Sequence, residues 1–169
     1  MDNYIKQATR TESLQFSAER PRLIHAALGI VTELMEYYES EDDVNLAEEI
    51  GDVYWYIAIA MDELDLTLDD IKSAHNGLGT TYMAIGGLCD VIKRSSFYGV
   101  PFDTETFTKW LGLTYHWLNL HCQHEGITPE QCMNANIAKL RKRFPDKFTT
   151  HDAVNRDTDA EMNALKGSL

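Results

Sequence analysis

The sequence predicts an all-α protein with an antiparallel four-helix bundle at its core, and three observations predict it. Apolar residues recur with a helical period over long stretches, no segment alternates as a strand would, and Gly and Pro fall between the periodic stretches. The 169 residues, 44% of them hydrophobic, suffice for one buried core and are too few for two ordinary domains. We expect one all-α domain over residues 1–148 and a polar C-terminal tail over 149–169.

The first two long helices are predicted over residues 22–39 and 45–64, where apolar residues follow a 3.6-residue period. Arg20 and Pro21 fit the start of the first helix, and the polar residues 40–43 fit a short turn. An α-hairpin over about 22–64 follows. Further helices are expected over about 80–96, 104–124 and 129–144, and another in the stretch before Pro21.

Two acidic pairs lie in this hairpin, Glu33 with Glu36 and Glu49 with Asp52. Positions i and i+3 share one face of a helix, so each pair projects its two carboxylates in one direction, and the hairpin brings both pairs together. Four ionised carboxylates crowd together only if they are protonated or hold a cation. Oxygen ligands without Cys or His favour Mg²⁺, with Mn²⁺ as a possible substitute. The same spacing also occurs on solvated helix faces, so spacing alone leaves both interpretations open.

A weak internal repeat relates residues 45–76 to residues 106–137 by a shift of 61 positions. Identical residues in this comparison are Gly51 and Gly112, Tyr54 and Tyr115, Thr67 and Thr128, and Ala74 and Ala135. The four acids Glu33, Glu36, Glu49 and Asp52 align with Gly87, Asp90, Trp110 and Leu113, the first two by a shift of 54. We therefore predict a pseudo-twofold duplication with a degenerate second copy over about 80–144.

The last predicted helix shows the opposite loss, because Asn136 and Lys139 align with His75 and Leu78 of the first copy. Each copy thus holds half of the chemistry. This indicates one composite site per chain, with metal ligands from the first hairpin and polar or basic groups from the last helix.

Composition excludes several classes of partner. A formal charge of −12 argues against a nucleic-acid polymer, since phosphate-backbone binding needs a basic surface. No apolar run approaches the length of a membrane span, so we expect no membrane partner. Cys89, Cys122 and Cys132 form no CxxC pattern and leave one cysteine unpaired in any disulfide scheme, which is typical of a reducing compartment. We expect a cytoplasmic protein.

A family resemblance becomes specific at residues 29–36 (GIVTELME) and 48–55 (EEIGDVYW). They resemble the ExxE and ExxD halves of the all-α nucleoside triphosphate pyrophosphohydrolases, the MazG-like superfamily. Residues 136–148 and 155–157 are similar to the C-terminal block of small single-domain members, and residues 2–11 resemble the N-terminal block more loosely. Residues 97–101 resemble the turn between the two acidic helices, yet here they lie in the copy that lacks the acids.

The resemblance implies hydrolysis of a ribo- or deoxynucleoside triphosphate to a monophosphate and pyrophosphate, in control of the nucleotide pool. The four carboxylates would hold Mg²⁺, which keeps several waters and acidifies one for attack on the α-phosphorus. Glu33 or Glu36 would accept the proton. The residues do not say which carboxylate only binds metal.

The basic end of the last helix supplies the predicted substrate contacts. Lys139 and Arg143 lie four residues apart and would neutralise the triphosphate and the pyrophosphate leaving group, and Asn136 shares the Lys139 face. The same basic run would also compensate the helix dipole. Trp55 is compatible with base stacking or with the core, and Glu48 with the metal's surroundings or with solvent.

Three alternatives stay open at this point. The same chemistry would serve a phosphoribosyl-ATP or alarmone pyrophosphohydrolase, since base and ribose contacts alone separate these substrates. The degenerate second copy also allows a catalytically silent helical nucleotide-binding module. The resemblance implies homodimers, whereas a duplication allows one chain to supply a whole pseudo-dimer; we expect a homodimer.

Overall fold

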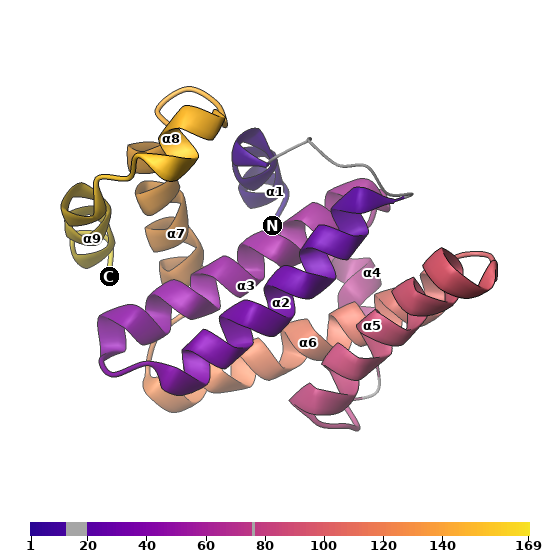
Figure 1. The fold of residues 1–169 in the computed structure, drawn as a ribbon. Coiled ribbons are helices and arrows are strands. Elements are labelled where there is room, and N and C mark those ends of the chain that lie inside the picture. Colours follow the sequence, from indigo (N-terminus) through magenta and orange to yellow (C-terminus); the bar gives the residue numbers. More distant parts are fainter. Residues whose placement is uncertain (13–19, 76) are drawn as a thin grey trace.

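The computed structural model describes residues 1–12, 20–75 and 77–169, and within these ranges the chain is helical and contains no strand (Figure 1). The all-α prediction is therefore confirmed. The elements are α1 (Asp2–Ala8), the 3₁₀ helix η1 (Thr9–Thr11), α2 (Pro21–Glu39), α3 (Asp43–Glu63), α4 (Leu68–Ser73), α5 (Thr81–Tyr98), α6 (Thr104–Glu125), α7 (Pro129–Arg143), α8 (Thr150–Val154) and α9 (Thr158–Lys166). The helix expected before Pro21 is α1, and residues 13–19 of that stretch lie outside the described residues.

Polar side chains cap the helices where the turn residues predict their starts. The Asp42 carboxylate accepts hydrogen bonds from the first backbone amides of α3, and Thr128 forms a capping box with Gln131 at α7. Glycines in the left-handed region end α5 and α6, with φ of 64° at Gly99 and 71° at Gly126. These caps set the hairpin turns and hence the antiparallel directions of the long helices.

Helices α2 and α3 lie side by side along their length and form the predicted first hairpin (Figure 1). Their facing residues are fully buried, among them Leu23, Ile30 and Ile57. Close approach depends on Gly29, because a Cβ there would collide with the Tyr56 ring. The hairpin therefore packs one aromatic ring directly on helix backbone, next to the turn of α2 that carries Glu33.

The second hairpin, α5 with α6, joins the first through reciprocal crossings. Helix α4 follows α3 and packs on α6, whereas α7 follows α6 and packs on α3. Two glycines allow these approaches. An alanine Cβ at Gly51 would lie 2.8 Å from the Cys132 carbonyl oxygen and 3.0 Å from Asn136 Cβ, and one at Gly112 would collide with the Ile71 carbonyl. Both crossings are thus backbone contacts at glycine.

Residues 149–169 are predicted as a polar tail, but the structure folds most of them into α8 and α9 and packs α9 on α7. The reason is a small buried face: Glu161 is 2% exposed and Leu165 is 1% exposed on a helix whose other residues are largely polar. So few buried residues give almost no periodic signal in the sequence. Across the described ranges, no helix combines the length and apolar character needed to span a membrane.

Candidate functional site

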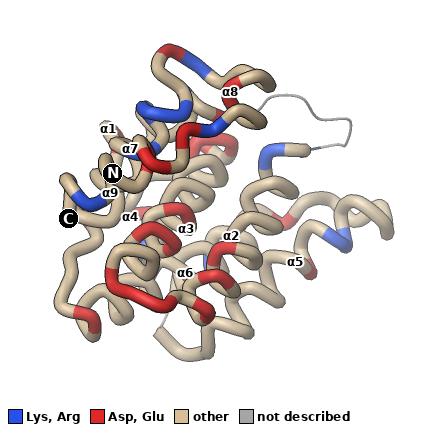
Figure 2. The backbone as a smooth tube through the Cα atoms, turned by 60° about the vertical axis from the view of Figure 1, so that its left-hand side comes forward, with Lys and Arg blue, Asp and Glu red and all other residues tan. Residues whose placement is uncertain are grey.

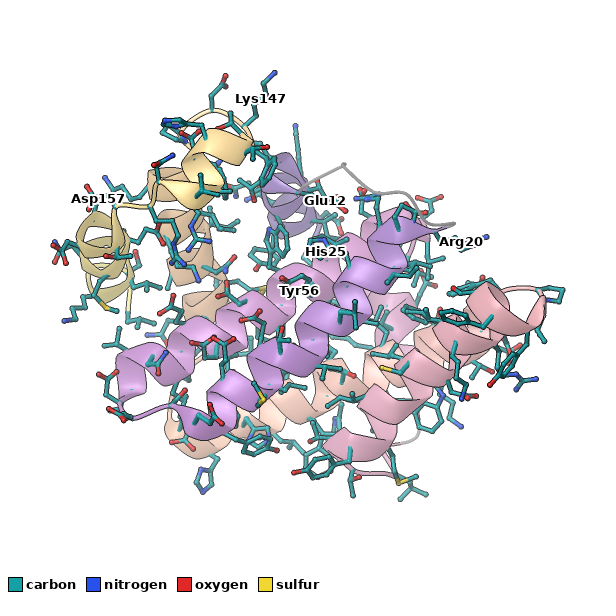
Figure 3. All side chains as sticks on the ribbon, viewed as in Figure 1. Glu12, Arg20, His25, Tyr56, Lys147 and Asp157 are labelled. Carbon is teal, nitrogen blue, oxygen red and sulfur yellow. The ribbon has the colours of Figure 1, made fainter. Side chains whose placement is uncertain are left out.

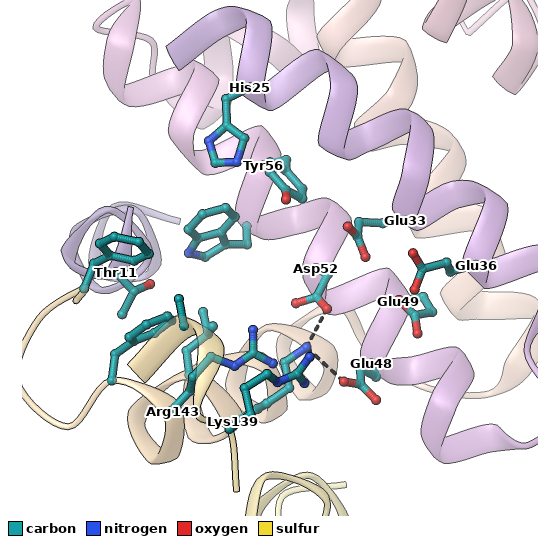
Figure 4. A pocket seen from close by; sticks show the side chains of 16 residues that line it. Thr11, His25, Glu33, Glu36, Glu48, Glu49, Asp52, Tyr56, Lys139 and Arg143 are labelled. Carbon is teal, nitrogen blue, oxygen red and sulfur yellow. Dashed lines mark hydrogen bonds and ion pairs between the residues drawn. The ribbon is translucent and has the colours of Figure 1, made fainter. Parts of the chain in front are cut away.

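Glu33, Glu36 and Glu49 form an acidic cluster at the middle of the α2–α3 hairpin (Figure 4). Each offers a carboxylate oxygen, and these oxygens all lie within 4.8 Å of one another. Glu49 is buried, Glu33 is half-buried and Glu36 is exposed. Asn45, one turn before Glu49, donates a hydrogen bond of 2.7 Å to its Oε1 atom and fixes that side chain. The structure thus brings Glu49 of the second predicted pair to Glu33 and Glu36 of the first, whereas Asp52 lies outside this cluster.

Two carboxylates of the acidic cluster, Glu33 and Glu49, hold protons unusually tightly. Burial, together with the neighbouring charges of Asp52 and Glu36, raises the pKa of Glu33 to about 7. Burial and the Asp52 charge likewise raise the pKa of Glu49 to about 8. Such shifts arise where like charges crowd in a poorly solvated place. The cluster therefore needs positive charge, from protons or from a cation, at neutral pH.

Asp52 lies in the same pocket, but protein groups already engage its oxygens. Its Oδ2 atom accepts a hydrogen bond of 2.5 Å from Lys139 Nζ, and its Oδ1 atom accepts one from the Asn136 amide. Lys139 Nζ also lies 3.0 Å from Glu48 Oε1. Asp52 therefore lies between the acidic cluster and α7. Glu48, for which the sequence left the metal's surroundings and solvent as alternatives, forms an ion pair with Lys139.

Lys139 keeps its charge although it is 2% exposed. Burial alone would lower the pKa of Lys139, yet the charges of Asp52 and Glu48 outweigh burial and raise it. The partner Asn136 is itself fixed, since its Oδ1 atom accepts a 3.1 Å hydrogen bond from Tyr4 on α1. The Tyr4 hydroxyl also lies 3.2 Å from the Gly51 carbonyl oxygen. The N-terminal helix thus supports the site, a role that no spacing rule predicts.

Two arginines extend the positive charge beyond Lys139, and Glu161 on α9 joins them. Arg143 Nη2 lies 2.5 Å from Glu161 Oε2, and Arg156 Nη2 lies 2.7 Å from the same oxygen. Burial would raise the pKa of Glu161, but the two guanidiniums hold it at about 2. Lys139, Arg143 and Arg156 together form what we call the cationic wall of the pocket. Arg143 was predicted as a site residue, whereas Glu161 was not and Arg156 appeared only within a family motif.

The acidic cluster, Glu48, Asp52 and the cationic wall line one cavity of about 490 Å³. Figure 2 shows acidic residues along α2 and α3 and basic residues around α7 and α8, and the cavity is lined by residues of both groups. Its further walls are aromatic or apolar apart from Thr11, and consist of Thr11, His25, Trp55, Tyr56, Leu140, Phe144, Phe148 and Ala153. Acidic cluster, cationic wall and an aromatic end therefore share one space.

Three rings define the aromatic end. His25 meets Tyr56 edge-on at a centroid distance of 5.2 Å and Trp55 at 5.9 Å. Figure 3 shows His25 and Tyr56 side by side, on the side of the α2–α3 hairpin that faces α1 and α8. The Trp55 indole donates a 2.9 Å hydrogen bond to the Ala8 carbonyl, which fixes its ring. Burial lowers the pKa of His25, so this ring is neutral at neutral pH. Trp55 is thus a pocket residue as well as a core residue, whereas Tyr54 is fully buried.

The other His, Cys, Asp and Glu residues that the structure describes form no second cluster of this kind. Among the described residues, the acidic cluster alone gathers three His, Cys, Asp or Glu ligand atoms within 4.8 Å. His121 instead pairs with the Tyr37 hydroxyl at 2.9 Å. In the second hairpin, a Cβ at Gly87 would collide with the Trp110 ring, so an indole fills the place between α5 and α6.

Comparisons of the chain with protein-family models, curated proteins and solved structures return no match.

Proposed function

We propose that the chain is a Mg²⁺-dependent nucleoside triphosphate pyrophosphohydrolase of the MazG-like class, which converts a ribo- or deoxynucleoside triphosphate to the monophosphate and pyrophosphate. One observation carries the proposal: a single cavity joins the acidic cluster, the cationic wall and the aromatic end. A cation, a polyphosphate and a nucleobase have the chemistry that these three parts suit. The cavity volume of about 490 Å³ lies in the range of small-molecule sites.

The donor set fits a hard divalent cation. Carboxylate oxygens of Glu33, Glu36 and Glu49 converge within 4.8 Å, and no softer ligand stands among them. The raised pKa values of Glu33 and Glu49 add support, because crowded carboxylates gain most from a cation. Asp52 would complete the set if it exchanged its contact with Lys139. When bound, Mg²⁺ polarises phosphoryl oxygens and acidifies water.

The protein's own groups then divide the work. Glu33, with a pKa near 7, is suited to accept the proton of the water that attacks the α-phosphorus. Lys139 and Asn136 orient Asp52 from α7. Arg143 offers a planar fork for the negative charge that develops on the departing pyrophosphate. The aromatic end, with a neutral His25 among apolar rings, would receive the base.

We also infer that the two hairpins form a four-helix bundle that arose by duplication. The shift of 61 residues places Gly51 on Gly112, Ile71 on Cys132 and His75 on Asn136. These same residues make the two crossings: Cys132 and Asn136 contact Gly51, and Ile71 and His75 contact Gly112. An ordinary pair of amphipathic hairpins has no reason to repeat such a contact at matched positions.

The second copy has lost its centre under this proposal. Trp110 and Gly87 stand at the positions of Glu49 and Glu33, and the indole packs where the two carboxylates would meet. One chain thus carries one site, built from α2 and α3 of one copy and α7 of the other. The homodimer stays a prediction, which light scattering on the eluting protein tests.

A panel of ribo- and deoxynucleoside triphosphates, incubated with Mg²⁺ or EDTA, tests the proposed reaction. We expect pyrophosphate and a monophosphate in equal amounts, in Mg²⁺ alone, and none from Glu36→Gln. Phosphoribosyl-ATP and an alarmone belong in the panel, because cleavage of either in preference to every simple triphosphate would replace the proposed substrate. Release of orthophosphate, or no cleavage by a folded protein, would overturn the reaction itself and favour a silent binding module.

A further inference from the structure

Glu161 is buried, and both of its neighbours are arginines that line the cavity. It is 2% exposed, and its two oxygens each accept two hydrogen bonds. Arg143 reaches it through Nε at 3.1 Å and Nη2 at 2.5 Å. Arg156 does the same through Nε at 3.3 Å and Nη2 at 2.7 Å. One carboxylate therefore holds two guanidiniums by the same edge.

The bonding pattern leaves a matched pair of donors. Both arginines use Nε and Nη2 on Glu161, and within the described residues the Nη1 atoms make no hydrogen bond or ion pair. Arg143 and Arg156 both line the cavity that also holds the acidic cluster. Figure 4 shows Arg143 beside Lys139, with Asp52 between them and Glu33. Arg143 and Arg156 thus each have one guanidinium edge on Glu161 and a second edge without a partner among the described residues, in the wall that faces the acidic cluster.

The positive charges of Arg143 and Arg156 explain why both arginines share the Glu161 carboxylate. Two guanidiniums close together repel, and a shared anion removes that repulsion while the planar forks fix their orientation. The other cation of the wall, Lys139, is occupied by Asp52 and Glu48. Lys139 thus has two carboxylates in direct contact with its ammonium, whereas Arg143 and Arg156 each keep a guanidinium edge for an anionic ligand.

We infer that Glu161 is a positioning residue, and that Arg143 and Arg156, which we call the arginine clamp, bind the β- and γ-phosphates of the substrate. This inference rests on the proposed function and deepens it, because it makes α9 part of the active site. A clamp with two forks matches two terminal phosphates. It therefore selects triphosphates over diphosphates, since a diphosphate has no γ-phosphate for the second fork.

A plain structural role for Glu161 predicts something different. If the carboxylate only fastens α9 and the α8–α9 loop to α7, its removal lowers stability and leaves substrate preference unchanged. If it orients the arginine clamp, its removal weakens polyphosphate binding selectively. The number of phosphates in the ligand separates these roles.

The test compares Glu161→Gln, Arg156→Gln and the control Asp159→Asn. Asp159 is an exposed acid two positions before Glu161 on α9, so its loss changes the charge equally without touching the clamp. Binding of inorganic pyrophosphate is measured by calorimetry in EDTA, which makes this readout independent of metal and of turnover. Values of kcat and KM are measured with Mg²⁺ for the best triphosphate and its diphosphate.

We expect Glu161→Gln and Arg156→Gln each to weaken pyrophosphate binding by about tenfold and to raise KM for the triphosphate similarly, a factor typical of one lost charged contact. In Arg156→Gln, KM for the diphosphate should change by less than about threefold, because Arg143 keeps its pair with Glu161 and still meets the β-phosphate. The double variant Glu161→Gln, Arg156→Gln should bind pyrophosphate about as weakly as Glu161→Gln alone, because both substitutions disrupt the same arginine clamp. Asp159→Asn should match the wild type.

Two results overturn the clamp. The first is an unchanged pyrophosphate affinity and an unchanged KM in Glu161→Gln despite a lower melting temperature. The second is an equal rise in KM for diphosphate and triphosphate in Arg156→Gln. If Glu161→Gln fails to fold, Arg156→Gln decides alone, since it keeps the Arg143–Glu161 pair. Failure of the proposed function looks different. A wild type that cleaves no nucleotide but binds pyrophosphate in a Glu161-dependent way supports the clamp and rejects the reaction.

Discussion

The Nζ atom of Lys139 lies 2.5 Å from the Oδ2 atom of Asp52, and this contact joins the two halves of the site. Asp52 belongs to the acidic hairpin, whereas Lys139 comes from α7 and is buried. The pair places a full positive charge next to four acids before any ligand arrives. It therefore links the stability of the α3–α7 crossing to the charge of the centre.

Lys139→Met tests that link. We expect turnover to fall at least about 100-fold, since an oriented charge near the reacting phosphate is lost. Unfolding free energy should fall by about 1–3 kcal/mol, because Asp52 loses its buried partner. Enzyme kinetics and urea denaturation measure the two effects. Lys142→Met, an exposed change on the same helix, should alter neither; equal effects of both variants would show that general charge matters instead of this contact.

Glu36→Gln tests cation binding at the acidic cluster. Losing one charged ligand should weaken Mg²⁺ binding at least about tenfold, an effect of about 1.4 kcal/mol. The Mg²⁺-induced rise in melting temperature should shrink accordingly, because that rise follows the ratio of ligand concentration to Kd. Glu39→Gln, at the end of the same helix and outside the cavity, should keep the wild-type rise. An unchanged rise in Glu36→Gln would remove Glu36 from the centre.

The metal-free protein should lose stability as pH rises from about 5.5 to 8.5. Burial raises the pKa of Glu33 to about 7 and that of Glu49 to about 8, from an ordinary value of 4.5. The folded state thus holds these protons more tightly, so their contribution is complete below pH 4.5 and is lost through pH 7 and 8. Glu161 has the opposite sign, but its pKa of about 2 acts below this window.

Calorimetry in EDTA measures this pH dependence. The melting temperature should fall by a few degrees across the window, and Mg²⁺ should restore more at pH 8.5 than at pH 5.5, where protons compete with it. The double variant Glu33→Gln, Glu49→Gln should flatten the metal-free profile. A melting temperature that rises with pH in EDTA would contradict the assignment.

Gly51→Ala tests the α3–α7 crossing. Its Cβ would lie 2.8 Å from the Cys132 carbonyl, so α7 must move, which should cost about 1–3 kcal/mol of unfolding free energy. Gly86→Ala is the matched control, since a Cβ there meets nothing within 4 Å in an exposed helix position. That change should stabilise by roughly 0.5–1 kcal/mol through helix propensity. Urea denaturation of both variants checks the contrast.

Periodicity predicts the long helices well because each buries a continuous apolar stripe. The boundaries of α2, α3 and α6 fall within two residues of those expected, since Pro21, Asp42 and Asp103 mark the starts. Spacing of three residues also brings Glu33, Glu36 and Glu49 together, because the hairpin fixes their faces.

The rest of the pocket depends on contacts between distant segments, which no local pattern encodes. Tyr4 reaches Asn136 across most of the chain, and Glu161 looks like one of many acids on a polar helix. Asp52 is in the predicted place, but its contact with Lys139 depends on how α7 crosses α3. Only the tertiary arrangement reveals that the polar C-terminal segment forms a cavity wall.

The wide separation of Glu49 and Glu161 along the chain has a consequence during synthesis. Roughly a hundred residues lie between them, so at about 5–20 residues per second the acidic hairpin is made several seconds before α9. During that interval the nascent hairpin carries its negative charges without the cationic wall. Protons or free cations of the surrounding solution must then shield it, and under the proposed function a polyphosphate gains its arginine contacts only once the C-terminal segment is made.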